Sequence, residues 1–289
     1  CPTSTILSGL NAALNTTAKI ISISLGGEAT PNNGQTALSI AVNTAASTKV
    51  VVVAAGNNGP STACITSPGD AENVLTVGNS NDQGTTDQSD DTISSSSCSG
   101  PSAFGRFDPE LVAPGSSITS TYLSNSTATL SGTSMAAPHV SGAVALLLEY
   151  NSSLIPSEIR KILMHTATTM TSVHVLTQGT GIINVTKALE NKLTINTTQY
   201  DRLELLFTAN TYTTPLTITN RANETQQITL NLTTLSDLEE DFILNTSILT
   251  TNSSFVLNPY TSETINLSFS IPTNTTPAIY AGILNISSN

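Results

Sequence analysis

The chain has 289 residues, enough for one large domain or two smaller ones, each able to bury a hydrophobic core. Its formal net charge of −11 repels phosphate backbones, so we expect no nucleic-acid partner. The longest apolar runs, residues 50–55 and 143–148, are too short to cross a bilayer, and we predict no membrane span.

In chain order, the first part of the sequence alternates between helical patterns and short apolar runs. We predict helices over residues 7–14, 36–47, 136–150 and 156–165, and buried strands over residues 19–24, 50–55 and 73–77. Strands that alternate with helices are typical of a parallel sheet covered by helices. The sequence therefore predicts an α/β domain.

The pattern changes near residue 192, and we place domains at residues 1–192 and 193–289. Residues 216–218, 228–232 and 265–269 alternate apolar and polar side chains, with turn-prone stretches between the runs. Such alternation predicts short antiparallel strands with one buried face, and a segment of about ninety residues suits an all-β sandwich.

Cysteines and asparagines bear on the compartment. Cys1, Cys64 and Cys98 leave the redox state open, because a Cys64–Cys98 disulfide and free thiols both fit the sequence. Asn-x-Ser/Thr sequons occur twelve times, where composition alone gives about seven or eight. This excess favours an extracytoplasmic protein, either secreted or at the cell surface.

The segment with the clearest chemistry is residues 132–140. It places Ser134 after a glycine turn, at the start of a helix of small and apolar residues, with Pro138 expected in the first helical turn. The N-terminus of a helix offers unpaired N–H groups and the positive end of the dipole, which suits an oxyanion that forms beside the serine. A lone Gly-x-Ser is more often an ordinary cap of a buried helix.

The longer run at residues 130–142, Leu-Ser-Gly-Thr-Ser-Met-Ala-Ala-Pro-His-Val-Ser-Gly, resembles the nucleophile motif of subtilases, the subtilisin-like serine proteases. Residues 23–27, 53–60 and 109–115 resemble three further segments of that family, in the same order. The resemblance covers roughly residues 1–192 and implies a subtilisin-like α/β fold truncated on its N-terminal side. More loosely, residues 216–220, 258–259 and 278–286 resemble a fibronectin-III-like β-sandwich.

The resemblance assigns roles to matching residues. Ser134 would attack the scissile carbonyl, and its N–H and the side-chain amide of Asn57 would stabilise the oxyanion. The implied substrate-binding residues are Ser24, Leu25, Gly26, Ala54, Ala55 and Gly56. The first three would pair with an extended peptide, and the last three would wall the pocket for the residue before the cleaved bond. Because these walls are small and uncharged, we expect broad or apolar specificity.

A subtilase also needs a histidine base and an aspartate that orients it. The Asp-x-Gly-type and His-Gly-Thr-His-type motifs that supply them do not occur in this sequence. Its histidines, His139, His165 and His174, lie in contexts that do not match that base. We therefore expect a serine endopeptidase whose Asp and His lie outside this sequence, so that the chain alone is inactive. The alternative is a non-catalytic peptide-binding or cell-surface pseudoprotease.

The expected chemistry requires no cofactor, and the expected partners are polypeptide substrates. Subtilases often bind structural calcium, and residues 82–91 contain four aspartates. These aspartates lack the regular spacing of an EF-hand loop. We interpret the stretch as a solvated loop and assign no metal ligand.

Overall fold

The structure is a computed structural model that describes residues 2–27, 33–102, 106–197, 211–232, 235–236, 243–244, 254–270 and 284–288. Cys1 and part of the 278–286 segment lie outside these residues. The chain divides into two compact units, Cys1–Leu189 and Glu190–Asn289. The domain limits at residues 1–192 and 193–289 stay predictions. No helix among the described residues has the length and apolar character that a membrane span requires.

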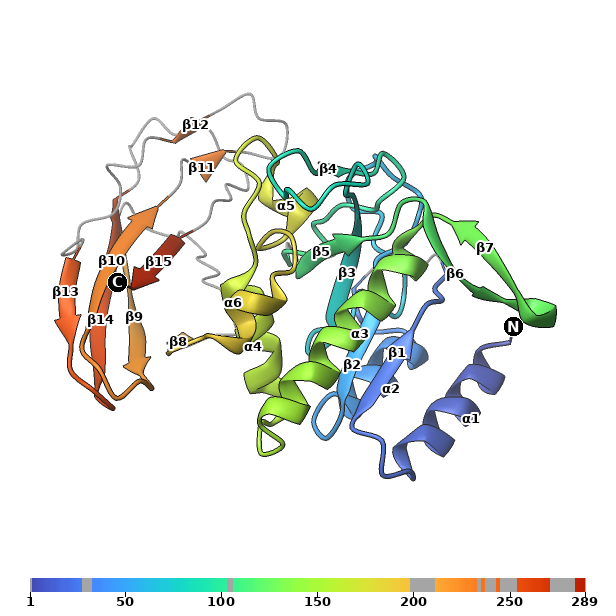
Figure 1. Cartoon of the computed structure of the whole chain (residues 1–289), viewed down its shortest axis with the longest axis horizontal. Helices are drawn as coiled ribbons and strands as arrows, with labels where there is room; N and C mark the ends of the chain where they lie inside the picture. The colour runs from blue at the N-terminus through green and yellow to red at the C-terminus, as the bar shows by residue number, and fades with distance from the viewer. Residues whose placement is uncertain are drawn as a thin grey trace. The chain divides into compact units, whose positions relative to one another are not determined.

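The first unit is built on a five-stranded sheet (Figure 1). Its strands are β1 (Ile20–Ile23), β2 (Val50–Ala54), β3 (Leu75–Asn81), β4 (Thr92–Ile93) and β5 (Leu111–Pro114). The order is β1-β2-β3-β4, and β5 also pairs with β3. β1, β2, β3 and β5 run parallel, whereas β4 pairs antiparallel with β3. The sheet is therefore mixed, and the expectation of a purely parallel sheet is wrong for this short strand.

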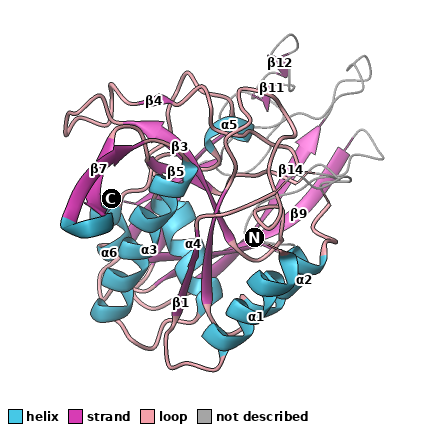
Figure 2. Ribbon diagram, turned by 90° about the vertical axis from the view of Figure 1, so that its right-hand side faces the viewer, coloured by secondary structure: helices cyan, strands magenta, loops and turns pink. Residues whose placement is uncertain are grey.

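Helices cover both faces of the sheet (Figure 2). α1 (Thr3–Leu14) and α2 (Ala37–Ala45) lie on one side, and α3 (Thr133–Tyr150), α4 (Pro156–Thr166) and α6 (Val185–Leu189) lie on the other. All five residues of β2 are buried because its side chains alternate between the two cores. Val51 and Val53 pack with α1 and α2, while Val50, Val52 and Ala54 pack with α3 and α4. The predicted helices and strands of this unit are all confirmed.

Two connections of this unit matter for the site. A hairpin of β6 (Ile118–Tyr122), a short 3-10 turn (Leu123–Asn125) and β7 (Ser126–Leu130) leads from β5 into α3. A disulfide joins Cys64, in the connection from β2 to β3, to Cys98, in the connection from β4 to β5, with Cα atoms 5.3 Å apart. The structure thus selects the disulfide over free thiols. The remaining helix, α5 (Val175–Gln178), follows α4.

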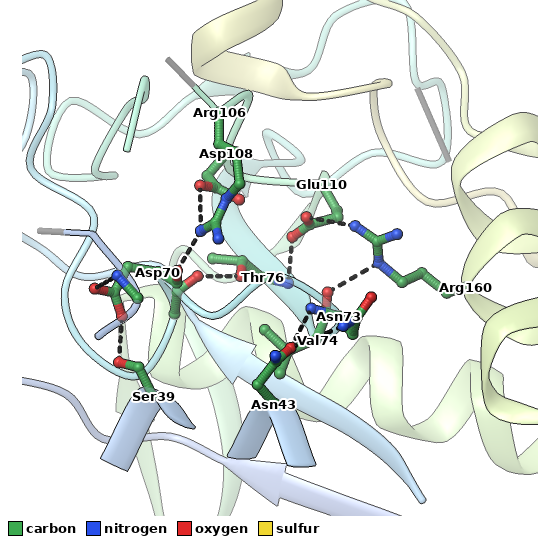
Figure 3. Close-up of polar contacts among 12 residues, drawn as sticks. Ser39, Asn43, Asp70, Asn73, Val74, Thr76, Arg106, Asp108, Glu110 and Arg160 are labelled. Carbon is green, nitrogen blue, oxygen red and sulfur yellow. Dashed lines mark hydrogen bonds and ion pairs between the residues drawn. The ribbon is translucent and has the colours of Figure 1, made fainter. Parts of the chain in front are cut away.

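Charged side chains are buried where β3 and β5 meet the surrounding loops (Figure 3). Arg106 pairs with Asp108 at 3.2 Å and donates to the carbonyl oxygen of Asp70. Burial opposes the charge of Arg106, but the nearby carboxylates of Asp108, Glu110 and Asp70 outweigh burial and raise the pKa of its guanidinium. These contacts anchor the loops around the sheet.

A second buried ion pair ties α4 to the sheet. Arg160 donates from Nη2 to Glu110 Oε1 at 2.9 Å and from Nε to the carbonyl of Val74 at 3.0 Å. The other oxygen of Glu110 accepts from the N–H of Thr76 at 2.7 Å. Glu110 therefore joins β3 to α4, and its charge is both paired and hydrogen-bonded (Figure 3).

The second unit contains two three-stranded antiparallel sheets and a short strand pair. One sheet has the order β14-β9-β8, from β8 (Leu193–Thr197), β9 (Thr211–Asn220) and β14 (Ser262–Ser270). The other has the order β13-β10-β15, from β10 (Gln226–Leu232), β13 (Ser254–Leu257) and β15 (Leu284–Ser288). β11 (Leu235–Ser236) and β12 (Ile243–Leu244) form the pair.

Both of these sheets contribute to one core. Its buried members are Leu193, Leu216, Ile218, Ile228, Leu230, Leu257 and Leu267. In β9 the inward residues Leu216 and Ile218 alternate with partly exposed threonines, as the period-two pattern predicts. The strand predictions at residues 216–218, 228–232 and 265–269 fall within β9, β10 and β14.

Candidate active site

Ser134 is the second residue of α3, which begins at Thr133, three residues before the predicted start. Gly132 precedes the helix with φ 147° and ψ 170°, a conformation that glycine adopts readily. A Cβ atom on Gly132 would come within 3.2 Å of Asn57 Oδ1. The glycine thus allows the chain to enter the helix close against Asn57.

Pro138 removes one backbone hydrogen bond from α3. It lies in the second turn of α3, so its predicted place in the first turn is wrong. Because proline has no N–H, it cannot donate to the carbonyl of Ser134, four residues earlier. The hydroxyl of Ser24 donates to that carbonyl at 2.9 Å instead. The bond that Pro138 removes from the helix is therefore replaced by a contact with the residue that follows β1.

The hydroxyl of Ser134 makes the reciprocal contact. It is half-buried and donates to the carbonyl of Ser24 at 3.3 Å. Ser24 and Ser134 thus meet through two hydrogen bonds, although 110 positions separate them in the sequence. In the structure, the nucleophile predicted from α3 lies against the predicted substrate-pairing segment.

Asn57 is held beside the start of α3. Its Oδ1 accepts from the N–H of Thr133 at 2.9 Å and from the hydroxyl of Thr133 at 3.1 Å. The same hydroxyl accepts from the N–H of Gly56 at 3.2 Å. These bonds orient the Asn57 amide next to Ser134, and they leave Nδ2 as the donor end of that amide.

A pocket of about 290 Å³ opens at this point. Five of the predicted site residues besides Ser134 line it: Leu25, Gly26, Ala54, Gly56 and Asn57. Ala55 instead is fully buried and packs with Ile65 and Cys98. Ser24 meets the site through its bonds to Ser134.

The pocket also contains Gly27, Asn58, Thr66 and Thr133, which sequence reasoning did not assign. Gly27, Asn58 and Thr133 are direct neighbours of predicted residues, so their positions follow from the motifs. Thr66 comes from the connection between β2 and β3, and no local pattern indicates chemistry there. The one relevant signal is its place two residues after Cys64, because the disulfide holds this segment.

The histidines do not approach the serine. His139 is exposed on α3, and its Nδ1 lies 2.9 Å from the carbonyl of Met135 in the same helix. The Nδ1 of His174 accepts from the N–H of Leu176 at 3.2 Å, and His165 belongs to α4. Within the described residues, which include all three histidines, no imidazole contacts the hydroxyl of Ser134.

The acidic loop at residues 82–91 shows repulsion among its carboxylates. Burial and the negative charges of Asp82, Asp90 and Asp87 raise the pKa of Asp91. Asp90 accepts a hydrogen bond from Thr85 at 2.9 Å. In the part of the chain that the structure describes, no three His, Cys, Asp or Glu side chains are grouped to hold a metal ion.

Comparisons with known proteins show which proteins this chain resembles. The model of the Subtilase family matches residues 1–198. The chain is 40% identical over 161 residues to Serine protease AprX of Bacillus subtilis, covering 50% of this chain and 36% of that protein. It is 39% identical over 190 residues to Subtilisin DY of Bacillus licheniformis, covering 65% and 62%. A third relative, 38% identical over 169 residues, is the Extracellular serine proteinase of a Thermus species, with 57% and 37% covered.

Solved structures show the same likeness. The structure of the Prenylagaramide maturation protease PagA matches with a TM-score of 0.55 and 27% identity, over 64% of this chain and 66% of that one. The protease domain of PatA, solved as a mutant, matches with a TM-score of 0.54 and 29% identity, over 64% and 63%. The chain spans between 36% and 62% of the length of the three relatives named above. Its match to the family model over residues 1–198 shows that this chain belongs to the subtilase family.

Proposed function

We propose that this chain is the nucleophile-bearing part of a subtilisin-type serine endopeptidase, with Ser134 as the nucleophile. One observation carries the proposal. The start of α3 places Ser134 in the same pocket as Asn57 and the segment that follows β1. Three separate parts of the chain thus supply a nucleophile, an oxyanion donor and a peptide groove within one site.

In this proposal a base takes the proton of Ser134 while Oγ bonds to the scissile carbonyl carbon. The carbonyl oxygen becomes an oxyanion, which accepts hydrogen bonds from Asn57 Nδ2 and the N–H of Ser134. The C–N bond then breaks, the amine leaves with the proton, and water hydrolyses the acyl ester. The donors lie at the positive end of α3, which favours the developing negative charge. No step calls for a cofactor.

The substrate is a polypeptide in extended form. Ser24, Leu25 and Gly26 follow β1 and are exposed, so their main-chain groups can pair with an added strand. Such pairing uses the substrate backbone and reads little of its sequence. Side-chain selection then belongs to the pocket between Gly26 and Gly56.

We further propose that these 289 residues alone do not hydrolyse peptides, because no imidazole reaches Ser134. Activity would require a base and an orienting carboxylate that this sequence does not supply. The same observation favours the alternative, a pseudoprotease that binds peptides without cleaving them. The two functions differ in whether Ser134 reacts once a base is provided.

The remaining assignments are also proposals. We assign residues 1–192 to the protease domain and residues 193–289 to a fibronectin-III-like β-sandwich, which is supported by two antiparallel sheets sharing one core. A secreted or cell-surface location is supported by the sequons, the disulfide and a relative whose name is Extracellular serine proteinase.

Labelling with a fluorophosphonate tests the function. The chain would be reacted with and without added imidazole as an external base, and the modified residue would be identified by peptide mass spectrometry. We expect an adduct on Ser134 that depends on imidazole and is lost in Ser134→Ala. Ser126→Ala, an exposed serine on the nearby hairpin, is the matched control and should label normally.

Each other outcome contradicts one part of the proposal. Rapid labelling of Ser134 without imidazole would show that the chain contains its own base. If imidazole produced no adduct on Ser134, the non-catalytic alternative would replace the endopeptidase.

A further inference from the structure

The Asn-x-Ser/Thr sequons are concentrated in the second unit. Each unit contains 13 asparagines, and Ser and Thr make up about three in ten residues of both units, so composition alone gives about four sequons in each. The first unit has four sequons, whereas the second unit has eight. The excess of sequons over chance therefore belongs entirely to the second unit.

The sequon asparagines of the second unit lie on its surface. Wherever the structure describes their side chains, they are exposed: Asn196, Asn223, Asn231 and Asn266. Asn220, by contrast, is 1% exposed, and its Nδ2 lies 2.8 to 3.2 Å from three backbone carbonyl oxygens. Arg and Ala follow Asn220, so this buried asparagine is not in a sequon. In the described part of the unit, the motif thus occurs where a bulky group has room.

Two of these asparagines point away from the core in the middle of a strand. Asn266 precedes Leu267 in β14, and Leu267 is buried in the core, so the alternation of a strand directs Asn266 outward. Asn231 has the same relation to the buried Leu230 in β10. Since β14 and β10 belong to different sheets, the outer face of each sheet carries a sequon asparagine.

The two sheets have few charges of their own. In the six strands β8, β9, β10, β13, β14 and β15, the one charged residue is Glu263. Among the described strands, β14 and β13 are at the edges of their sheets, and Val256 in β13 is 52% exposed. An uncharged edge strand can pair with a strand of another molecule, and proteins commonly prevent this by charging or covering the edge. A hydrated oligosaccharide on Asn266 would cover the edge at β14.

We propose that the second unit is N-glycosylated on Asn223, Asn231 and Asn266, and that these glycans keep its weakly charged strands from pairing with other chains. The co-substrate is an oligosaccharide carried on a polyprenyl diphosphate. Nδ2 of the asparagine bonds to C1 of the first sugar, the bond from C1 to the diphosphate oxygen breaks, and Nδ2 releases one proton as the lipid diphosphate leaves.

This inference goes beyond the proposed protease chemistry. It requires the proposed extracytoplasmic location, and it does not depend on the reactivity of Ser134. Transfer before folding meets no obstacle from the strands, and the exposed positions leave room for the glycans once the unit has folded.

Glycopeptide mass spectrometry tests the modification on protein isolated from the cells that produce it. After proteolysis, peptides that contain each asparagine would be searched for sugar oxonium ions and for an added oligosaccharide mass. We expect an oligosaccharide on Asn223, Asn231 and Asn266 in most molecules. Asn258 is exposed in the same unit but is followed by Pro and Tyr, and it should be unmodified. Unmodified masses at all three sequon asparagines would overturn the proposal.

Substitutions of Thr225 separate the sequon from its asparagine. Thr225→Ala keeps Asn223 but removes the sequon, so the glycan on Asn223 should be lost. Thr225→Ser preserves the sequon and should retain the glycan. Thr225 is exposed, so neither change disturbs the core. A glycan that persists on Asn223 in Thr225→Ala would contradict attachment through the sequon.

A double variant tests what the glycans do. Asn231→Gln, Asn266→Gln should lose two oligosaccharides and aggregate at least about twofold faster than the unchanged protein at equal concentration, measured by light scattering. Asn258→Gln is the matched control and should aggregate no faster. If the double variant lacks both glycans but aggregates at the unchanged rate, the protective role is wrong and the modification sites stand.

The two proposals can fail separately. Asn223, Asn231 and Asn266 do not line the pocket, so imidazole-supported labelling of Ser134 should proceed in every glycan variant. Absence of labelling in the unchanged chain would contradict the proposed protease function and leave the glycosylation sites standing. Absence of glycans with normal labelling would contradict only the glycosylation.

Discussion

Hydroxyl side chains are arranged differently in the two units. In the second unit they form an outward ladder across β9 and β14, where Thr213 meets Ser268, Thr217 meets Thr264 and Thr219 meets Ser262, at 2.8 to 3.1 Å. In the first unit Ser24 follows β1, whereas Thr133 and Ser134 begin α3, and the hydroxyls of these residues come together beside one pocket.

The difference lies in what each arrangement can do. Hydroxyls that lie directly opposite one another on paired strands satisfy each other, and they stabilise a sheet. The hydroxyls of Ser24 and Ser134 instead donate to backbone carbonyls, and that of Thr133 donates to the side chain of Asn57, which leaves the Nδ2 donor of Asn57 beside a pocket. Serine and threonine content alone does not distinguish the ladder from the pocket. The helices and strands that carry the hydroxyls do.

Removal of a buried charge should have the largest effect on stability. The prediction compares the buried Arg160–Glu110 pair of the first unit with the exposed Lys192–Glu224 pair of the second. Glu110→Ala leaves Arg160 buried without its carboxylate, so we expect a loss of about 3–5 kcal/mol in the free energy of unfolding, measured by urea denaturation. Glu224→Ala, which removes the exposed partner of Lys192, is the control and should cause no resolvable change. Similar losses of unfolding free energy in both variants would contradict the difference between the buried and the exposed ion pair.

Loss of the proposed oxyanion donor should have the next largest effect, on the reactivity of Ser134. Asn57→Ala should lower the rate of imidazole-supported fluorophosphonate labelling of Ser134 by about 100- to 1,000-fold, which is about 2.7–4 kcal/mol. The neighbouring Asn58 also lines the pocket, and Asn58→Ala should label almost as fast as the unchanged chain. Equal labelling rates in the two variants would contradict the role of Asn57 as an oxyanion donor.

Removal of the disulfide should be slightly less costly. The Cys64→Ser, Cys98→Ser double variant opens a loop with a sequence separation of 34 and should lose about 2–4 kcal/mol of unfolding free energy. A reducing agent should lower the stability of the unchanged chain but not that of the double variant. Insensitivity of the unchanged chain to reduction would contradict a stabilising role for the disulfide.

A single member of the ladder should contribute little. Thr217→Ala removes one cross-strand hydroxyl pair and should cost about 0.2–1 kcal/mol, measured as a shift of the denaturation midpoint. It should not change the labelling rate of Ser134. A large change in that rate would show that the ladder takes part in the site.

The acidic loop should give the smallest effect. The pKa of Asp91 lies above its ordinary value, so the folded state holds the proton more tightly, and ionisation reduces stability as pH rises. Asp91→Asn should therefore raise Tm slightly at pH 7, and the gain should vanish near about pH 3, where the aspartate is protonated.

Asp87 in the same loop should behave in the opposite way. The N–H of Ser89 donates to its carboxylate at 2.9 Å and lowers the pKa of Asp87, so its charged form favours the folded state above the unfolded pKa. Asp87→Asn should lower Tm at pH 7. A gain in Tm for both variants would mean that repulsion dominates the whole loop.

Much of this arrangement could be predicted because the relevant signals are local. Ser134 and Asn57 lie in motifs whose residues are consecutive, and the apolar run of β2 indicates a strand that is covered on both faces. The glycine turn already indicates a helix that starts at Ser134, whereas the apolar pattern by itself begins only at residue 136, because Thr133 and Ser134 are polar.

The place of Thr66 in the lining of the pocket could not be predicted because it depends on tertiary contacts. Nothing near it in sequence indicates a pocket, and its position is set by bonds to Ala55 and by the Cys64–Cys98 link. The antiparallel strand β4 has only two residues, too few to show a period. The family resemblance assigned Ala55 to a wall of the pocket, and in the structure its side chain packs with Ile65 and Cys98.

A crystal structure of the fluorophosphonate adduct tests the central claim most directly, since it shows where the oxygen of a bound tetrahedral group points. The account predicts an adduct on Ser134 whose phosphoryl oxygen lies about 2.7–3.1 Å from both Asn57 Nδ2 and the N–H of Ser134. An oxygen that points into solvent, with Asn57 Nδ2 bonded elsewhere, would contradict it.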